Sequence, residues 1–441
     1  MKKHFSRFVF VSFIFLSVSI LPKENEDPKP KNTENPLFAG EEFGKEDFLS
    51  RWNLEELETF AVSSNPLYLK EKQNIGMARG DIITASLYYN PVINTQQQFM
   101  GARANAGTGL PETSIIYNQP FDVSGVIPQR EKVAKQEFLA VIASFNDFDR
   151  IFRLRLRQNF WTYLYVTEQI NFQKEFLENY QDLLDLTKLR AEKGDISFLE
   201  YDRLTLERIQ IDRDYRNARI LRAQVVKNLR VLIGIPDTQI PLKVKGRLEF
   251  FSTKEFGIDL SDFDIENRPD LIALKLRQQR ERMNVELKKR EAIPTLTLGM
   301  EYLNKGNENV TGVYATIPLP MFDRKQGEVL KFEESHKKLG FEVEAKRNEI
   351  TTEISAAIKE LQARESQLLE YKAFDLVNKN KEVQEKSRLA YIRGASNLVT
   401  FLEAEKTYLN VLRSYYEIIY LYYNALEAFR AAVGKMDTSD Y

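Results

Sequence analysis

The chain has 441 residues, of which 43% are hydrophobic and 29% charged, and its formal net charge is −1. This balance lacks the basic excess that is typical of nucleic-acid-binding proteins. The sequence has no cysteine, which excludes disulfides, thiolate metal sites and a cysteine nucleophile. It has only two histidines, His4 and His336, so a histidine-built metal site or a Ser-His-Asp triad is not expected. His336 lies among charged residues of a helical pattern and is predicted to be solvated.

The N-terminus has the pattern of a secretory signal peptide. Lys2, Lys3 and Arg7 precede an apolar run at 8–21. This run is shorter than the roughly 20 residues that a membrane-spanning helix needs. We predict a signal peptide at residues 1–21, with an uncleaved anchor as the alternative. No later stretch approaches such a span, so the exported chain is either soluble or reaches a membrane through β-strands.

Beyond the leader, the chain contains a long internal duplication. Residues 22–50 are rich in Pro, Lys and Glu and are predicted to be extended or disordered. After them, matching proline, phenylalanine and glycine positions recur in the same order about 200 residues apart, which indicates that the chain consists of two duplicated halves. The matching pairs are Pro66 and Pro269, Pro91 and Pro294, Phe121 and Phe322, Gly194 and Gly394, and Gly234 and Gly434. The predicted segments are a first repeat at 51–234, a linker at 235–265, a second repeat at 266–434 and a tail at 435–441.

Each half contains two predicted strands joined by a turn. They lie at about 92–104 and 112–121 in the first half, and at about 294–303 and 310–320 in the second. The third strand alternates most clearly, and this pattern of about ten residues is the weak signature of a transmembrane β-strand. One face carries Leu296, Leu298, Met300 and Tyr302, and the other carries Thr295, Thr297, Gly299 and Glu301. Two ordinary hairpins in a soluble domain are the alternative interpretation.

The predicted helices have matching lengths. Residues 127–193 and 326–393 are each predicted to form one helix of about 100 Å. In each half, two shorter helices of about 60 Å and 37 Å would together equal that length if they were stacked end to end. Such a pairing predicts a uniform wall of helices. The second long helix also has an apolar stripe for lateral packing. The stripe comprises Val329, Phe332, Leu339, Val343, Ile350, Ile354, Ala357, Leu361 and Leu368.

Four strands in one chain cannot close a barrel, and open strand edges are not tolerated in lipid. If the strands lie in a membrane, several chains must therefore share one barrel. Three copies in a cyclic assembly would supply 12 strands, which lies within the known range.

Several stretches of the sequence resemble the TolC-like outer-membrane factors, the exit ducts of tripartite efflux pumps. They are "NRPDLIALKLR" (267–277), "IPLPMFDRKQG" (317–327), "GDISFLEYDRL" (194–204) and "YIRGASNLVTFLEAEKTYL" (391–409). The resemblance extends over about residues 50–435, and two of these stretches are most similar to the CzcC-like heavy-metal branch. It implies a mainly α fold with a small β part, in which a homotrimer forms a 12-stranded barrel in the outer membrane. A periplasmic α-helical tunnel would continue this barrel.

The same resemblance implies the partners and the working parts. A periplasmic adaptor and an inner-membrane pump of the resistance-nodulation-division (RND) class would dock at or near the lower end of the tunnel. Residues 235–265 would lie in the equatorial belt. The glycine breaks would be hairpin tips facing the adaptor. The tip residues are Lys193, Gly194, Asp195, Ser197, Arg393, Gly394, Ser396 and Asn397.

Acidic side chains beyond each tip glycine are the candidates for a closed periplasmic gate. They are Glu200 and Glu403, and threefold symmetry would convert each into a ring that favours cations. Thr400 stands where the family frequently has an acidic residue, so different pairs could hold this gate. Solvated helix charges are the alternative interpretation.

The strand-to-helix turns are the predicted points where barrel becomes tunnel. In "IPLPMFDRKQG", Pro318 and Pro320 would end the fourth strand, because proline cannot donate to a ladder. Phe322 would join an interfacial aromatic girdle, and Asp323 would cap or precede the long helix. The first half repeats this junction with Phe121, Asp122 and Pro128, the last as an early helix residue.

The sequence therefore predicts a passive conduit rather than an enzyme, with no cofactor and no metal site of its own. If the cargo is a metal ion, its selection should lie in the pump and adaptor. Drug efflux and type I protein secretion remain alternatives, and a secreted coiled-coil structural protein is the runner-up from another class.

Overall fold

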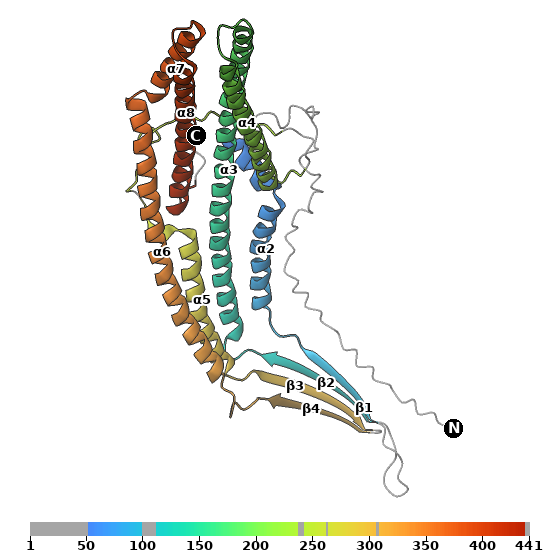
Figure 1. Ribbon diagram of the computed structural model, residues 1–441. Coiled ribbons are helices and arrows are strands. Elements are labelled where there is room, and N and C mark those ends of the chain that lie inside the picture. The colour runs from blue at the N-terminus through green and yellow to red at the C-terminus, as the bar shows by residue number, and fades with distance from the viewer. Residues whose placement is uncertain (1–51, 99–111, 237–241, 262, 306–307, 437–441) are drawn as a thin grey trace, which may run out of the picture. The chain divides into compact units, whose positions relative to one another are not determined.

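Long helices carry most of the described chain, and one four-stranded sheet lies at one end of them (Figure 1). The computed structural model describes residues 52–98, 112–236, 242–261, 263–305 and 308–436. The predicted signal peptide, the segment 22–50 and the end of the first predicted strand lie outside these ranges. No helix within them is long and apolar enough to cross a bilayer.

Both halves of the chain contain the same order of principal elements. The first half comprises α1 (Leu54–Ser64), α2 (Pro66–Ser86), β1 (Val92–Gln98), β2 (Glu112–Phe121), α3 (Val126–Glu192) and α4 (Phe198–Ile233). The second comprises α5 (Pro269–Glu291), β3 (Leu296–Lys305), β4 (Glu308–Thr316), α6 (Gln326–Ala373), α7 (Leu376–Ile392) and α8 (Leu398–Ala432), after a short 3₁₀ turn at Ile265–Asn267. Helix α1 has no counterpart in the sequence-based prediction; Asn53 and Glu56 start it with a capping box.

The helices pack side by side, and the long helices alternate with pairs of shorter helices stacked end to end. Helix α3 contacts α2 and α4 on one side and α5 and α8 on the other. Helix α6 contacts α5 and α8, and α7 contacts α8. The two short pairs therefore flank the long helices, as the length comparison predicts. His336 is half-buried in this packing, and its Nδ1 is 2.9 Å from the backbone oxygen of Gln278, so the side chain predicted to be solvated is only partly so.

One polar residue joins each pair of stacked helices. The Asn65 amide donates to the α4 backbone oxygens of Val231 and Leu232, at 3.0 and 2.7 Å. Its Oδ1 accepts from the backbone N–H groups that begin α2, so Asn65 ends one helix and starts the next. In the second half, the Arg268 guanidinium donates to the oxygen of Ala432, directly before α5 begins.

Replacing Gly234 at the first joint should destabilise the protein. Gly234 has φ +76°, and an added Cβ would lie 3.0 Å from both Ser64 O and Asn65 Cα. We expect Gly234→Ala to cost about 1–2 kcal/mol for the left-handed backbone and about 1 kcal/mol or more for crowding. Gly434→Ala is the matched control, since it shares the positive φ but its Cβ would meet nothing closer than 3.8 Å. If chemical denaturation shows the same loss of unfolding free energy in both variants, crowding at Gly234 does not contribute.

The second long helix is not continuous, contrary to the sequence-based prediction for residues 326–393. It breaks at Phe374 and Asp375, where Asp375 has the left-handed φ of +52°. The buried residues of α6 explain the break. Ile354, Leu361 and Leu368 are buried and lie seven residues apart. If the helix continued with this spacing, the next buried positions would be 375, 382 and 389. Those positions are exposed, and Gln384 and Tyr391 are buried instead. The break absorbs this two-residue change of phase.

A network of buried charges ties α1, α3 and α8 together. The Arg157 side chain is 1% exposed and donates to Glu58 of α1 and, at 3.1 Å, to Glu427 of α8. Arg153 adds a second bond to Glu58 at 3.0 Å, and Arg430 lies 3.4 Å from Glu427. These charges lie beside apolar core residues such as Leu156 and Tyr422, and every acid in the network has a basic partner.

Candidate functional site

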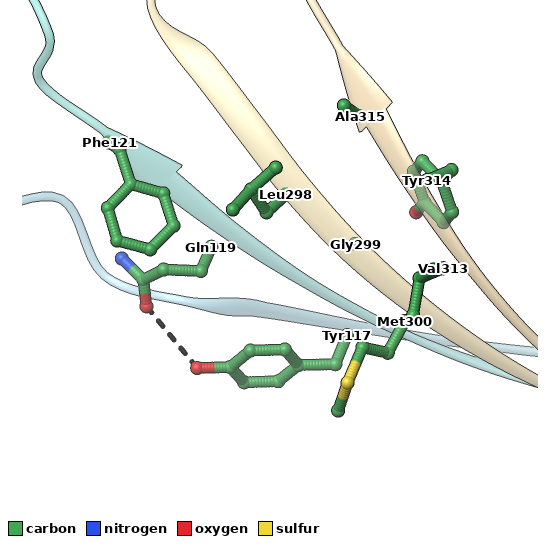
Figure 2. Close-up of a pocket in the computed structure, with 9 residues that line it drawn as sticks. All are labelled: Tyr117, Gln119, Phe121, Leu298, Gly299, Met300, Val313, Tyr314 and Ala315. Carbon is green, nitrogen blue, oxygen red and sulfur yellow. Dashed lines mark hydrogen bonds between the residues drawn. The ribbon is translucent and has the colours of Figure 1, made fainter.

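The sheet has one apolar face that is open to the surroundings. Its strands run β1-β2-β3-β4, all antiparallel. The register places Ile93, Tyr117, Met300 and Val313 in one cross-strand row, so their side chains share a face. Ile93, Met300 and Val313 are 66%, 60% and 83% exposed. Figure 2 shows part of this face, around a pocket of about 610 Å³ lined in part by Phe121, Leu298 and Met300.

The opposite face carries hydrogen-bonded polar groups. Ser114 donates to Glu301 at 3.1 Å, and Lys305 lies 3.5 Å from Glu112. The Tyr314 ring covers Gly299, where a Cβ would lie 2.3 Å from the ring, and its hydroxyl donates to Asn118 at 2.6 Å. The alternation predicted for the third strand is therefore present in the structure, whereas β1 and β4 alternate less clearly.

The two strand-to-helix junctions differ in how the helix starts. Asp122 accepts from the backbone N–H groups of Val126 and Ile127, at 3.0 and 2.7 Å, and so caps α3. Burial opposes ionisation of Asp122, but these backbone donors prevail and lower its pKa. Pro128 lies in the first turn of α3, as expected for an early helix residue.

The junction before α6 corrects one prediction and narrows another. Asp323 precedes α6, as one of the two predicted options has it, and does not cap it: it accepts from Lys325 N at 2.9 Å, and Lys325 itself is the N-cap, with a left-handed φ of +59°. Strand β4 ends at Thr316, four residues short of the predicted end at 320, and Pro318 and Pro320 beyond it have no backbone N–H to donate to a ladder. Phe322 is 89% exposed.

The predicted tips are two tight helix hairpins of the same construction. Gly194 and Gly394 have φ of +83° and +73°, and each follows a C-capping residue, Lys193 or Arg393. The next residue in each tip donates back to the helix, from Asp195 N to Arg190 O at 2.9 Å and from Ala395 N to Ala390 O at 2.8 Å. Ser197 and Asn397 then cap α4 and α8, while Ser396 is half-buried beside Asn397.

Among the three gate candidates, Glu200 is bonded to the other hairpin. The Tyr391 hydroxyl of α7 donates to Glu200 of α4 at 3.1 Å. Glu403 is exposed on α8. The Thr400 hydroxyl and backbone N–H both donate to Asn397, so Thr400 serves the helix cap. Arg190 adds a long contact of 3.5 Å to the Tyr391 backbone oxygen, so the two hairpins meet near their tips.

Two ion pairs that the sequence-based analysis missed continue this contact along α4 and α8. Lys406 lies 2.6 Å from Glu207, and Arg413 pairs with Asp214. The acidic residues 200, 207 and 214 recur every seven residues on α4, and the basic residues 406 and 413 do so on α8. Seven-residue spacing keeps side chains on one face of paired helices, so this charge pattern was readable from the sequence.

The fold is that of solved outer-membrane channel proteins. It is similar to CusC, described for transmembrane channel formation, with a TM-score of 0.72 at 15% identity over 88% of this chain and 93% of that chain. Vibrio cholerae VceC has a TM-score of 0.72 at 15% identity over 87% and 96% of the two chains. Campylobacter jejuni CmeC has a TM-score of 0.70 at 18% identity over 88% and 87%.

The sequence itself also matches a family. Residues 263–435 match the family model of the outer membrane efflux proteins. The search of curated proteins finds no match. The resemblance to outer-membrane efflux proteins is therefore confirmed, as is the mainly helical fold with a small sheet. This family is one of transport proteins, which agrees with the prediction that the chain is not an enzyme.

Proposed function

We propose that the chain is the outer-membrane exit duct of a tripartite efflux system and conducts its cargo passively. The amphipathic sheet is the observation that carries this proposal. It exposes a row of apolar side chains across its four strands, while Ser114 and Glu301 bond to each other on the other face. A lipid-facing wall with a polar lumen requires this arrangement. The long helices that follow β2 and β4 would continue the conduit into the periplasm.

The sheet supports assembly into a homotrimer. Its outer strands, β1 and β4, each have one edge without a neighbouring strand in the described sheet. In lipid, every backbone polar group needs a partner, so each such edge has to pair with another chain. Three copies related by a cyclic axis would close all edges in a ring of 12 strands.

The hairpin tips support the assignment of the closed end. The bond from Tyr391 to Glu200 and the ion pairs on α4 and α8 hold the two hairpins of one chain together. An adaptor and an RND pump would bind at the tips around Gly194 and Gly394, and would release these contacts. In the closed state, Glu200 and Glu403 of the three chains would form rings that favour cations.

Heavy-metal cations are the proposed cargo, on the resemblance of "LPMFDRKQG" and "GDIS" to the CzcC-like branch. Deletion of the gene should lower tolerance to zinc, cobalt or copper and leave tolerance to hydrophobic drugs unchanged. Plasmid-borne wild type should restore tolerance. Lost drug tolerance with unchanged metal tolerance would instead favour the drug-efflux alternative, and loss of a secreted protein alone would favour type I secretion.

Cell fractionation tests the more general claim that the protein is an outer-membrane duct. The wild-type protein should be recovered from outer membranes as a heat-modifiable oligomer on gels. Recovery as a soluble periplasmic monomer would contradict the duct and favour a secreted coiled-coil protein.

A further inference from the structure

Glu405 is a buried carboxyl group in the seam of the hairpin formed by α7 and α8. Glu405 is only 3% exposed to solvent. The Gln384 amide of α7 donates to its Oε1 at 2.5 Å. Phe401 and Leu412 on the same helix are buried, and so is Tyr180 of α3, which lies near Glu405. An acid in such a place costs free energy when it ionises.

The other hairpin shows that this position does not need an acid. The buried residues of α4 include Leu204, Ile211, Ala218 and Val225, which recur every seven residues. Those of α8 include Glu405, Leu412, Ile419 and Leu426, with the same spacing. Leu204 lies ten residues after Gly194, and Glu405 lies eleven residues after Gly394, with Leu398 one step before it in the α8 series. The chain thus has a fully buried leucine in one hairpin and a carboxyl in the other.

The position of Glu405 connects it to helix α7. Gln384 and Tyr391, seven positions apart, are buried in α7, and Tyr391 carries the bond to Glu200. Helix α7 is separated from α6 by the break at Phe374 and Asp375. The bond between Gln384 and Glu405 therefore holds α7 onto α8 between this break and the gate contact.

We propose that Glu405 is a proton-linked latch, which holds α7 against α8 while it is neutral and releases α7 when it ionises. The proposal rests on the proposed function, because the released α7 would loosen the Tyr391–Glu200 contact at the periplasmic end. Deprotonation sends the proton to water and leaves a carboxylate in the apolar seam, where it is stable only if the seam opens and hydrates it.

The surrounding groups determine the direction of the pH effect. Burial raises the pKa of Glu405, against the opposing effects of the Gln384 bond and of Arg388 on α7. Tyr180 on α3 and Tyr408 on α8 also face Glu405. The carboxyl groups near these two phenols are Glu207 on α4, Glu175 on α3 and Glu385 on α7. Burial also raises the pKa of Tyr180 and Tyr408, so both phenols stay neutral. Because the pKa of Glu405 is raised in the closed hairpin, the latch is fully present at low pH and is lost as pH rises through that value.

Hydrogen exchange of residues 376–392 in the full-length purified protein tests the latch. After correction for intrinsic rates, wild-type protection should fall between about pH 5 and about pH 8, by at most about tenfold per pH unit above the pKa. Glu405→Gln keeps the size but cannot ionise, and should show less than about a twofold change. Glu405→Leu, which copies Leu204, should behave in the same way and serves if the glutamine variant does not fold. Glu382→Gln, an exposed carboxylate on α7, is the matched control and should follow wild type.

The outcomes separate the latch from the duct. Wild-type protection that does not change with pH, or an unaltered pH dependence in Glu405→Gln and Glu405→Leu, would overturn the latch. In planar bilayers at the same pH values, the open fraction of wild type should rise in parallel with the loss of protection. A protein with the expected exchange behaviour that conducts at no pH would contradict the proposed function and not the latch.

Discussion

Arg157→Met should lower the free energy of unfolding by about 3–5 kcal/mol, because it leaves two buried carboxylates without their shared cation. Glu58 and Glu427 are 1% and 0% exposed at their side chains, and Arg157 bridges them. Arg153 would still contact Glu58, and Arg430 would still contact Glu427, but the cation that bridges the two acids would be lost. Denaturation in guanidinium can be followed by the fluorescence of Trp161, whose ring stacks on Tyr423 at 3.7 Å.

Two controls isolate the role of charge. Arg155→Met changes an exposed arginine two residues away on α3 and should cost no more than about 0.5 kcal/mol. Replacing Glu58 and Glu427 by leucine together with Arg157→Met removes the charges as a set and should recover much of the loss. A loss in Arg157→Met no larger than that in Arg155→Met would show that the network contributes nothing to stability.

Tyr391→Phe should raise the open fraction of the channel by about a hundredfold. The substitution removes the hydroxyl that bonds Glu200 and keeps the ring, which stacks on Phe401 at 5.4 Å. A hydrogen bond of this kind contributes about 1 kcal/mol, so three copies would contribute about 3 kcal/mol to the closed state. Single-channel recording in planar bilayers gives the open fraction.

Matched variants test whether the gate is held by this bond or by charge. Glu200→Gln weakens the same bond and should act in the same direction as Tyr391→Phe, without adding fully to it, since both changes remove one interaction. Tyr408→Phe removes a hydroxyl from the same apolar region without touching Glu200 and should leave the open fraction unchanged. Glu403→Ala together with Glu200→Ala should reduce cation preference. An open fraction that Tyr391→Phe does not alter would exclude this contact from the gate.

The parts of the fold that follow from local rules could be predicted from the sequence. Positive-φ glycines lie at both tips, and prolines start α2 and α5. The repeated glycines and prolines in the sequence therefore predicted where these helices begin and end. The alternation around Met300 identified the apolar face of β3. The parts that depend on contacts between distant segments could not be predicted. Arg157, Glu58 and Glu427 lie on three helices and show no common motif.

Two further misses have specific physical causes. The break at Asp375 has no proline or glycine to mark it, because an aspartate takes the left-handed conformation there; only the phase of the buried residues reveals it. Tyr391 was not recognised as a partner of Glu200, because its hydroxyl crosses between hairpins about 190 residues apart in the chain. By contrast, the acidic and basic residues every seven positions on α4 and α8 were visible in the sequence.

Site-directed spin labelling of the sheet tests the central claim most directly, and the absence of cysteine allows single labels without background substitutions. Gly312 and Val313 are neighbours on opposite faces of β4, and a Cβ at Gly312 meets no atom within 4 Å. In native outer membranes, a label at Val313→Cys should be accessible to oxygen dissolved in lipid and shielded from a water-soluble relaxation agent. A label at Gly312→Cys should show the reverse. Equal access of the water-soluble agent to both positions would place the sheet in water and contradict the account.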